Sequence, residues 1–191
     1  MTLECYGLKL ITAPTELPVS AGDVRIWGRN SSVIGEWSEA VLEDRIKAAV
    51  ELAEKFTGLS FIHQTWSMFL DGFPSWEIEL PKPPWDSITW VKYYDTNDVQ
   101  QTLATSGYIF DAVQGRLTPA LNASWPATAV KNNAVDIKFV SGFGASGSDC
   151  PAQVRECLLE IVEDRLKNRG GMFKIAPGTL EKLQSLWTGR I

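Results

Sequence analysis

Residues that could carry out catalysis are sparse in this sequence of 191 residues. A Ser–His–Asp triad or a histidine general base requires a histidine, and the chain contains one, His63. His63 lies between Ile62 and Gln64 in an alternating apolar and polar pattern, which favours a half-buried or edge residue of a strand. No HExxH, CxxC, P-loop or GxSxG motif is present. We therefore predict no catalytic residue, and we expect that the chain is not an enzyme.

Two other segments have residue types that bind ions but lack the required spacing. Asp95, Asn97 and Asp98 lack the DxDxDG spacing and the closing glutamate of a calcium loop, so a turn is expected there. The segment Gly142–Gly147 has spaced glycines between an expected strand and an expected helix, where a phosphate loop would lie. The Gly-Lys-Ser/Thr that would have to follow is missing, so a connector is favoured.

The three cysteines, Cys5, Cys150 and Cys157, are odd in number and lack metal-binding spacing. Cys150 and Cys157 are seven residues apart and therefore share one face of an expected helix, with no further ligands arranged nearby. We interpret them as buried apolar thiols in a reduced compartment. The sequence predicts no metal site and no cofactor.

Two ligand-binding alternatives remain open from the sequence. A hydrolase would need an acid pair, and the candidates are Asp71, Glu77, Glu79 and Asp111. A carbohydrate- or host-surface-binding β module would use exposed tryptophans, and five of the eight lie between Trp66 and Trp125. Burial of one such ring removes about 150–250 Å² from water, worth several kcal/mol at about 25 cal/mol per Å². Trp66 and Trp76 lie on apolar faces of expected strands, so core or interface packing is favoured.

Composition and charge exclude several classes of protein. Hydrophobic residues make up 45% of the chain and charged residues 21%, which are values of a folded globular protein. The net charge of −5 argues against a protein that grips nucleic acid over most of its surface. No apolar run is long enough for a transmembrane helix, and Met1–Leu10 has no basic region before an apolar run. We expect neither a secretory signal nor a membrane partner.

Apolar periodicity predicts helices at Ser38–Thr57 and Pro151–Arg169, and a short amphipathic segment at Leu180–Trp187. In the first helix the apolar stripe comprises Leu42, Ile46, Ala49, Val50, Ala53 and Phe56. In the second it comprises Val154, Cys157, Leu158, Ile161, Val162 and Leu166. Ser20–Gly35 is rich in glycine, serine and asparagine, and whether it is helical stays open.

Alternating apolar residues predict strands between the two long helices. The strand candidates are Phe61–Leu70, Trp76–Leu80, Ile88–Tyr94, Gly107–Val113 and Val135–Phe139, and Leu8–Ile11 is a further extended stretch. The predicted fold class is α+β, a helical bundle of two long helices plus a short C-terminal helix, with an inserted antiparallel β-region. Residues 1–58 and 145–191 are expected to form the helical scaffold, and residues 59–144 the inserted β-rich domain.

Several short runs of residues are similar to one protein family. They are Leu10–Pro14, Gln64–Trp66, Leu70–Pro74, Ile78–Pro84, Ser87–Val91, Ser124–Pro126, Asn133–Val135 and the Pro151–Arg169 helix. In these runs and in their order the sequence resembles the head–tail connector (adaptor, or head-completion) family of long-tailed double-stranded DNA bacteriophages and of gene transfer agents. The chain departs from the family at Ser20–Gly35, where family members usually show a clearer amphipathic helix.

The resemblance implies a structural virion protein without catalysis. Its copies would form an adaptor ring, usually a dodecamer, between the portal protein and a stopper or tail-completion protein. Genomic DNA would pass through the channel of the ring without sequence-specific binding, and the negative net charge suits such a channel. The expected location is the head–tail connector region of the virion, and the host cytoplasm during assembly.

The C-terminal segment is the expected contact with the portal or a neighbouring subunit. It is too short to form a stable helix alone, so its apolar face is interpreted as a docking element, with folding back on its own domain as the equal alternative. The predicted partner-binding residues are Leu180, Leu183, Leu186 and Trp187.

Overall fold

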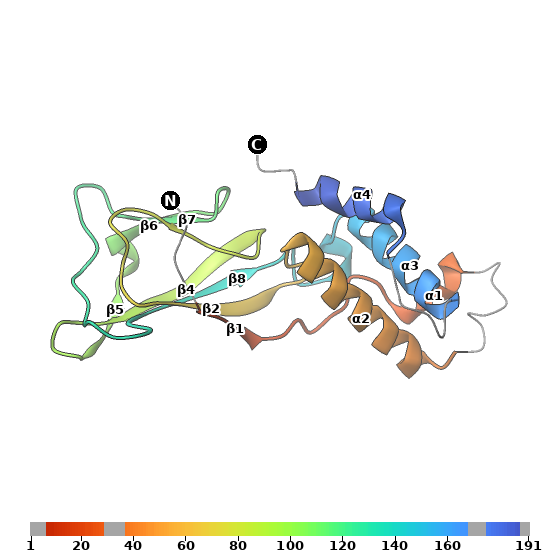
Figure 1. Ribbon diagram of the computed structural model, residues 1–191, viewed down its shortest axis with the longest axis horizontal. Helices are drawn as coiled ribbons and strands as arrows, with labels where there is room; N and C mark the ends of the chain where they lie inside the picture. Colours follow the sequence, from red (N-terminus) through yellow and green to blue (C-terminus); the bar gives the residue numbers. More distant parts are fainter. Residues whose placement is uncertain (1–6, 29–36, 168–174, 188–191) are drawn as a thin grey trace. The chain divides into compact units, whose positions relative to one another are not determined.

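The computed structural model describes residues 7–28, 37–167 and 175–187, without the side chains of residues 184, 186 and 187. The chain forms two compact units, each described by itself below (Figure 1). Residues 1–13 and 63–142 form one, here called the β unit, and residues 14–62 and 143–191 form the other, the helical unit.

The helical unit contains four described helices. They are α1 (Ala21–Trp27), α2 (Glu39–Thr57), α3 (Ala152–Lys167) and α4 (Pro177–Trp187), and a short 3-10 turn, Gly147–Asp149, precedes α3. Their apolar stripes meet in one core, which includes Val24 of α1, Ile46 of α2, Leu158 of α3 and Leu183 of α4. All four helices therefore contribute to one hydrophobic core.

Helices are observed at the two positions where periodicity predicted them, as α2 and α3. Gly58 adopts φ 74°, a left-handed conformation that a glycine tolerates, and its N–H bonds to Glu54 O, which ends α2. In α3 all six residues of the predicted apolar stripe are buried. In α2 Phe56 is exposed instead of buried, and Thr57 takes the inward position. Arg169, the predicted end of the second helix, lies outside the described residues.

Helix α1 begins with a capping box that was not predicted from the sequence. Ser20 Oγ accepts a hydrogen bond from Asp23 N–H at 3.1 Å, and Asp23 Oδ2 accepts one from Ser20 N–H at 2.8 Å. These contacts stabilise a first helical turn whose residues Ala21 and Val24 are buried in the core. Within Ser20–Gly35, residues 21–27 are therefore helical, and residues 29–36 lie outside the described part.

The predicted fold class, a bundle of two long helices plus a short C-terminal helix with one inserted β-region, is wrong. The described residues contain four helices, because the Ser20 cap makes α1 a further member of the helical core. They also contain two antiparallel sheets, of five and three strands, instead of one region. The periodicity of two helices was strong, so it dominated the predicted fold class, whereas the division of the strands into two sheets has no signal in the sequence.

The β unit contains a five-stranded sheet, whose strands are labelled in Figure 1, with the order β1-β2-β8-β4-β5. Its three-stranded sheet has the order β3-β7-β6. All pairs are antiparallel. The strands are β1 (Gly7–Thr12), β2 (Gln64–Leu70), β3 (Ile78–Glu79), β4 (Trp85–Tyr94), β5 (Gln100–Leu103), β6 (Tyr108–Asp111), β7 (Arg116–Pro119) and β8 (Val135–Ser141), with a 3-10 turn at Thr105–Gly107.

The side chains of the five-stranded sheet alternate between two faces. On one face Met68, Val91 and Ile137 lie in register and pack with Ile78 and Leu117 of the three-stranded sheet. That face is the core of the β unit. We call the opposite face, which bears Lys9, Ser67, Phe69, Trp90, Lys92, Asp136 and Lys138, the outer face.

Candidate interaction surfaces

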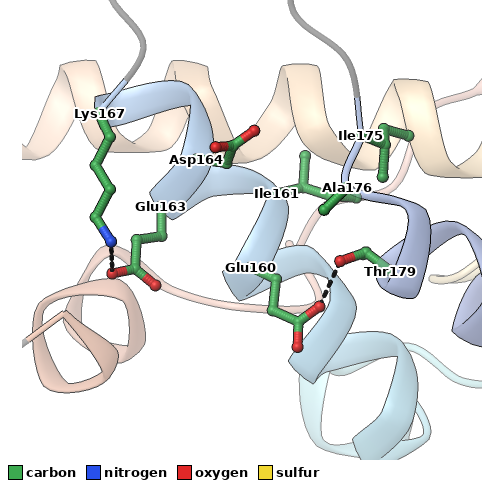
Figure 2. Close-up of a pocket in the computed structure, with 8 residues that line it drawn as sticks. All are labelled: Glu160, Ile161, Glu163, Asp164, Lys167, Ile175, Ala176 and Thr179. Carbon is green, nitrogen blue, oxygen red and sulfur yellow. Dashed lines mark hydrogen bonds and ion pairs between the residues drawn. The ribbon is translucent and has the colours of Figure 1, made fainter.

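A surface pocket of about 340 Å³ lies between α3 and α4 in the helical unit (Figure 2). Most of its polar lining comes from α3, which contributes Glu160, Glu163, Asp164 and Lys167, and α4 contributes Thr179. Ile161 and Ile175 supply apolar walls. The three carboxylates arise because the polar face of an amphipathic helix points away from the core at this position.

Glu160 is tied to α4 through both carboxylate oxygens. Thr179 Oγ1 donates to Oε2 at 2.6 Å, and Lys182 Nζ donates to Oε1 at 2.6 Å (the Thr179 contact is drawn in Figure 2). Lys182 also pairs with Glu156 at 3.0 Å. Burial raises the pKa of Glu160, but the hydrogen bonds from Lys182 and Thr179 outweigh that effect and lower the pKa below its ordinary value. Glu160 is therefore ionised and structural, not a general acid.

Glu163 is likewise occupied by neighbours within the helical unit. Its Oε1 pairs with Lys167 Nζ at 2.7 Å, one helical turn away, and its Oε2 accepts a hydrogen bond from Trp27 Nε1 of α1 at 3.0 Å. Thr179, whose hydroxyl is the one among the described residues that line the pocket, is occupied as a donor to Glu160. The contacts of Glu160 and Glu163 therefore fasten α1, α3 and α4 together.

The four residues predicted to bind a partner lie on α4. Leu183 is fully buried in the core of the helical unit, and Leu180 is half-buried. Leu186 and Trp187 belong to the helix, but their side chains are outside the described part. Since Leu183 packs inside its own unit, a change such as Leu183→Asp would damage the fold and cannot serve as a clean test of docking.

The acids considered for a hydrolase have structural contacts instead. Arg116 Nη1 lies 3.3 Å from Glu77 Oε2, and its Nη2 lies 3.7 Å from Glu79 Oε1. Asp111 accepts hydrogen bonds from the N–H groups of the turn that follows it, and Asp71 accepts one from Asn133 N–H at 2.8 Å. Glu77 and Glu79 therefore pair with one arginine, and Asp71 and Asp111 bind backbone N–H groups, so all four carboxylates have structural contacts within the β unit.

The other chemically interesting residues also have structural explanations. Asp95 Oδ1 accepts from Asn97 N–H at 2.9 Å and from Val99 N–H at 3.1 Å, which is the geometry of the predicted turn. Burial raises the pKa of Cys150 to about 12 and that of Cys157 to about 11, so both are protonated thiols. Cys5 lies outside the described residues, and His63 is half-buried.

The glycines of the segment 142–147 match the spacing G-x-G-x-x-G, but two of them are required by packing. A Cβ on Gly144 would lie 2.3 Å from the Cβ of Asp149, and a Cβ on Gly147 would lie 2.7 Å from Leu17 O. The strand before the segment, β8, is antiparallel to both of its neighbours, whereas a dinucleotide site follows a parallel strand. The segment is therefore a close-packed connector.

The tryptophans of the β unit divide between core and surface. Trp66, Trp85 and Trp125 are partly buried against its core. Trp125 stacks on Phe73 with ring centroids 4.8 Å apart and donates a hydrogen bond from Nε1 to Trp76 O at 2.6 Å. Trp76 itself is 60% exposed. It lies before β3, which spans two residues, so the strand predicted at Trp76–Leu80 is longer than the one observed.

Large apolar side chains are exposed at several loops and strand ends of the β unit. Those with more than half of their surface exposed are Trp76, Val99, Ile109, Val113, Leu121 and Val130. Ile26 on α1 is the corresponding residue of the helical unit. Sequence reasoning missed these positions, because no periodicity marks an apolar residue in a loop. Apolar residues scattered singly are common on the surfaces of monomeric proteins, so these positions by themselves do not mark an interface.

Two searches of the described residues gave negative results. No group of three or more His, Cys, Asp or Glu side chains in the described part of the chain is arranged to hold a metal ion. Among the helices of that part, none combines the length and the hydrophobicity needed to cross a bilayer.

Comparisons with known proteins give a match at the level of the fold. No family model matches the sequence, and no curated protein is significantly similar to it. A chain from the neck of an empty gene transfer agent (GTA) particle, computed with C6 symmetry, has a TM-score of 0.79 and 22% identity, with 95% of this chain and 94% of that chain covered. A chain from the virion of a native GTA particle has a TM-score of 0.78 and 20% identity, with 94% of each chain covered.

A third match comes from the neck of a native GTA particle computed with C12 symmetry, with a TM-score of 0.72 and 21% identity over 95% of this chain and 94% of that chain. These matches cover both units, so the likeness is not confined to the helices or to the sheets. The resemblance to head–tail connector proteins that the sequence indicated is thus confirmed as a likeness of fold: the chain has the fold of chains found in gene transfer agent particles and their necks.

Proposed function

We propose that this chain is a structural protein of the neck of a phage-type or gene transfer agent particle, where its copies form an adaptor ring between the portal and a stopper or tail protein. The supporting observation is the fold shared along nearly the whole length of both chains with proteins of GTA particle necks. In this role the ring extends the DNA channel and catalyses no reaction.

Ring formation by copies of this chain is supported by the symmetry of the similar particles. Two of the matching neck structures were computed with C6 and C12 symmetry. A ring requires heterologous contacts, in which one surface of a subunit meets a different surface of the next. The exposed apolar residues of the β unit, such as Val113, Leu121 and Val130, are available for such contacts. Twelve copies per ring is the stoichiometry that we propose.

The two units are proposed to act as separate domains with different tasks. The helical unit, with α4 packed on it through Leu183 and Glu160, is the scaffold and the portal-binding part. Leu180, Leu186 and Trp187 remain the proposed partner-binding residues of α4, with Leu183 supporting them from the core. The β unit is proposed to bind the next copy and the stopper or tail protein.

Co-purification tests this function directly. The chain is expressed with a tagged portal protein from the same genome, and the eluate is analysed by native mass spectrometry and electron microscopy. We expect a portal complex that carries twelve copies of this chain. A chain that ignores the portal and is absent from purified particles would exclude the proposed role.

A Leu186→Asp/Trp187→Asp variant then tests the docking residues. We expect it to lose portal binding while keeping the circular dichroism spectrum and the unfolding midpoint of the wild type. Glu181→Arg, an exposed change on the same helix, is the matched control and should bind normally. Normal portal binding by the double variant would remove the docking role from the end of α4.

A further inference from the structure

The outer face of the five-stranded sheet has an unusual concentration of lysines for an acidic chain. Lys9 of β1 is in register with Ser67 of β2, Ser67 with Lys138 of β8, and Lys138 with Trp90 of β4. Lys92 lies two residues along β4 from Trp90 and therefore on the same face. Neighbouring strands are about 4.8 Å apart, so Lys9 and Lys138 lie about two strand spacings apart in one row across the sheet, and Lys92, on β4, lies beside Lys138.

These lysines lack carboxylate partners in the described part of the chain. None of the ion pairs found among the described residues includes Lys9, Lys92 or Lys138. Asp136 is in register with Lys92, but their charged atoms do not form an ion pair within 4.0 Å. By contrast Lys131, which also lies near this sheet, is neutralised by Asp98 at 2.7 Å. The outer face therefore has an excess of positive charge.

Aromatic contacts hold two of the lysines in place. Lys138 Nζ lies 3.8 Å and Lys92 Nζ lies 4.2 Å from the centroid of the Trp90 ring. Two ammonium groups near one ring repel each other, and an anion bound near both offsets that repulsion. The side chains are thus ordered in advance, and an anionic partner would relieve the repulsion between them.

We propose that the outer face of the five-stranded sheet, through Lys9, Lys92 and Lys138, contacts the phosphate backbone of double-stranded DNA. Charge complementarity favours this occupant, because a pair of lysines at Trp90 and a third lysine two strands away match successive phosphates better than a single carboxylate. The inference rests on the proposed function, which brings DNA through the ring.

The small number of contacts suits a channel through which DNA must move. Each phosphate that a lysine neutralises releases counterions and makes the slope of log affinity against log salt more negative by about 0.9. Three contacts therefore give a slope of about −2.7. Binding by one copy is then weak and sensitive to salt, and the net charge of −5 opposes further attraction. Repetition around a ring adds avidity, while each phosphate contact is independent of sequence and lets the duplex slide.

Fluorescence anisotropy of a labelled 30-base-pair duplex, titrated with the full chain at several salt concentrations, tests the proposal. The wild type should show the slope of about −2.7 expected for three phosphate contacts. Lys9→Gln/Lys92→Gln/Lys138→Gln should weaken binding at low salt by at least about tenfold and bring the slope near zero. Lys9→Arg/Lys92→Arg/Lys138→Arg should retain both affinity and slope.

The matched control changes the net charge equally at exposed cations of the helical unit. Arg25→Gln/Lys47→Gln/Lys55→Gln should bind the duplex like the wild type. Equal loss in the control and the outer-face variant, or unchanged binding in the outer-face variant, would overturn the proposal. So would an outer-face variant that binds DNA normally but no longer assembles with its own copies, since the face would then be a protein interface. If these variants are still incorporated into particles, the proposed neck function stands even though the proposed DNA contact is excluded.

Discussion

Thr179 Oγ1 donates a hydrogen bond of 2.6 Å to Glu160 Oε2, and this contact joins the first turn of α4 to α3. The next turn of α4 adds the ion pair between Lys182 and Glu160 and the buried side chain of Leu183. Helix α4 has 11 residues, too few for a stable helix in isolation. Its helical conformation, and hence any docking by its end, depends on these contacts with α3.

Glu160→Gln is expected to lower the free energy of unfolding of the helical unit by about 1 kcal/mol, after allowance for solvent screening at Lys182. The change replaces two charge-assisted hydrogen bonds with neutral ones. Urea denaturation followed by circular dichroism measures the effect. Glu181→Gln removes a neighbouring exposed charge and should change stability by less than about 0.5 kcal/mol. Equal effects of the two changes would show that Glu160 does not hold α4.

The same carboxylate gives a pH dependence with a defined sign. The pKa of Glu160 is lower in the folded chain than its ordinary value of 4.5, because hydrogen bonds from Lys182 and Thr179 outweigh the effect of burial. A carboxyl group whose pKa is lowered by folding stabilises the folded state fully at pH values above its ordinary pKa. This stabilisation is lost as the pH falls through the pKa of the folded state. The stability difference between wild type and Glu160→Gln should therefore shrink below about pH 4.5. A difference that grows on acidification would contradict this assignment.

Capping predicts different effects for two serines that both precede helices. Ser20→Ala should cost about 1 kcal/mol, because the Ser20 side chain accepts the Asp23 N–H bond that begins α1. Ser38→Ala should cost much less, since Ser38 makes no side-chain cap bond at the start of α2. Thermal or urea unfolding of the two variants compares them directly. Equal losses would mean that the capping box does not stabilise α1.

Helical periodicity located α2 and α3, and strand alternation located most of the strands, but neither pattern revealed how these elements combine into the fold. The stripe from Val154 to Leu166 predicted α3 because every member is buried on one face. Helix α1 was missed, since its signal is one reciprocal cap and two buried residues within a glycine- and serine-rich segment. The edge strand β5, Gln100–Leu103, has three exposed polar residues before the half-buried Leu103, so its side chains show no alternation to detect. Its position is fixed by backbone pairing with β4.

Features of the candidate surfaces could be predicted only where the residues that form them lie close together in the sequence. Residue types alone indicated that Asp95 belongs to a turn and that Cys150 and Cys157 are buried. The row of Lys9, Lys138 and Lys92 joins residues from three strands, and its existence depends on register that the sequence does not display. The burial of Leu183 could not be predicted either. An amphipathic pattern does not say whether the apolar face of a helix packs on its own unit or on another protein chain.

Burial predicts that the two described cysteines do not react in the folded chain. In a Cys5→Ser background, Cys150 and Cys157 should resist a thiol reagent at pH 8, since their pKa values are raised to about 12 and about 11. Both should react once the chain is unfolded in guanidinium. Mass spectrometry counts the added groups. Rapid labelling of either thiol in the native chain would show that the helical core opens readily.

A cryo-electron microscopy reconstruction of the neck in particles that contain this chain tests the central claim most directly. The account predicts a ring of twelve copies between portal and tail, with each copy showing the helical unit and the β unit described above. Complete necks assembled without this chain, in particles from cells that produce it, would contradict the account.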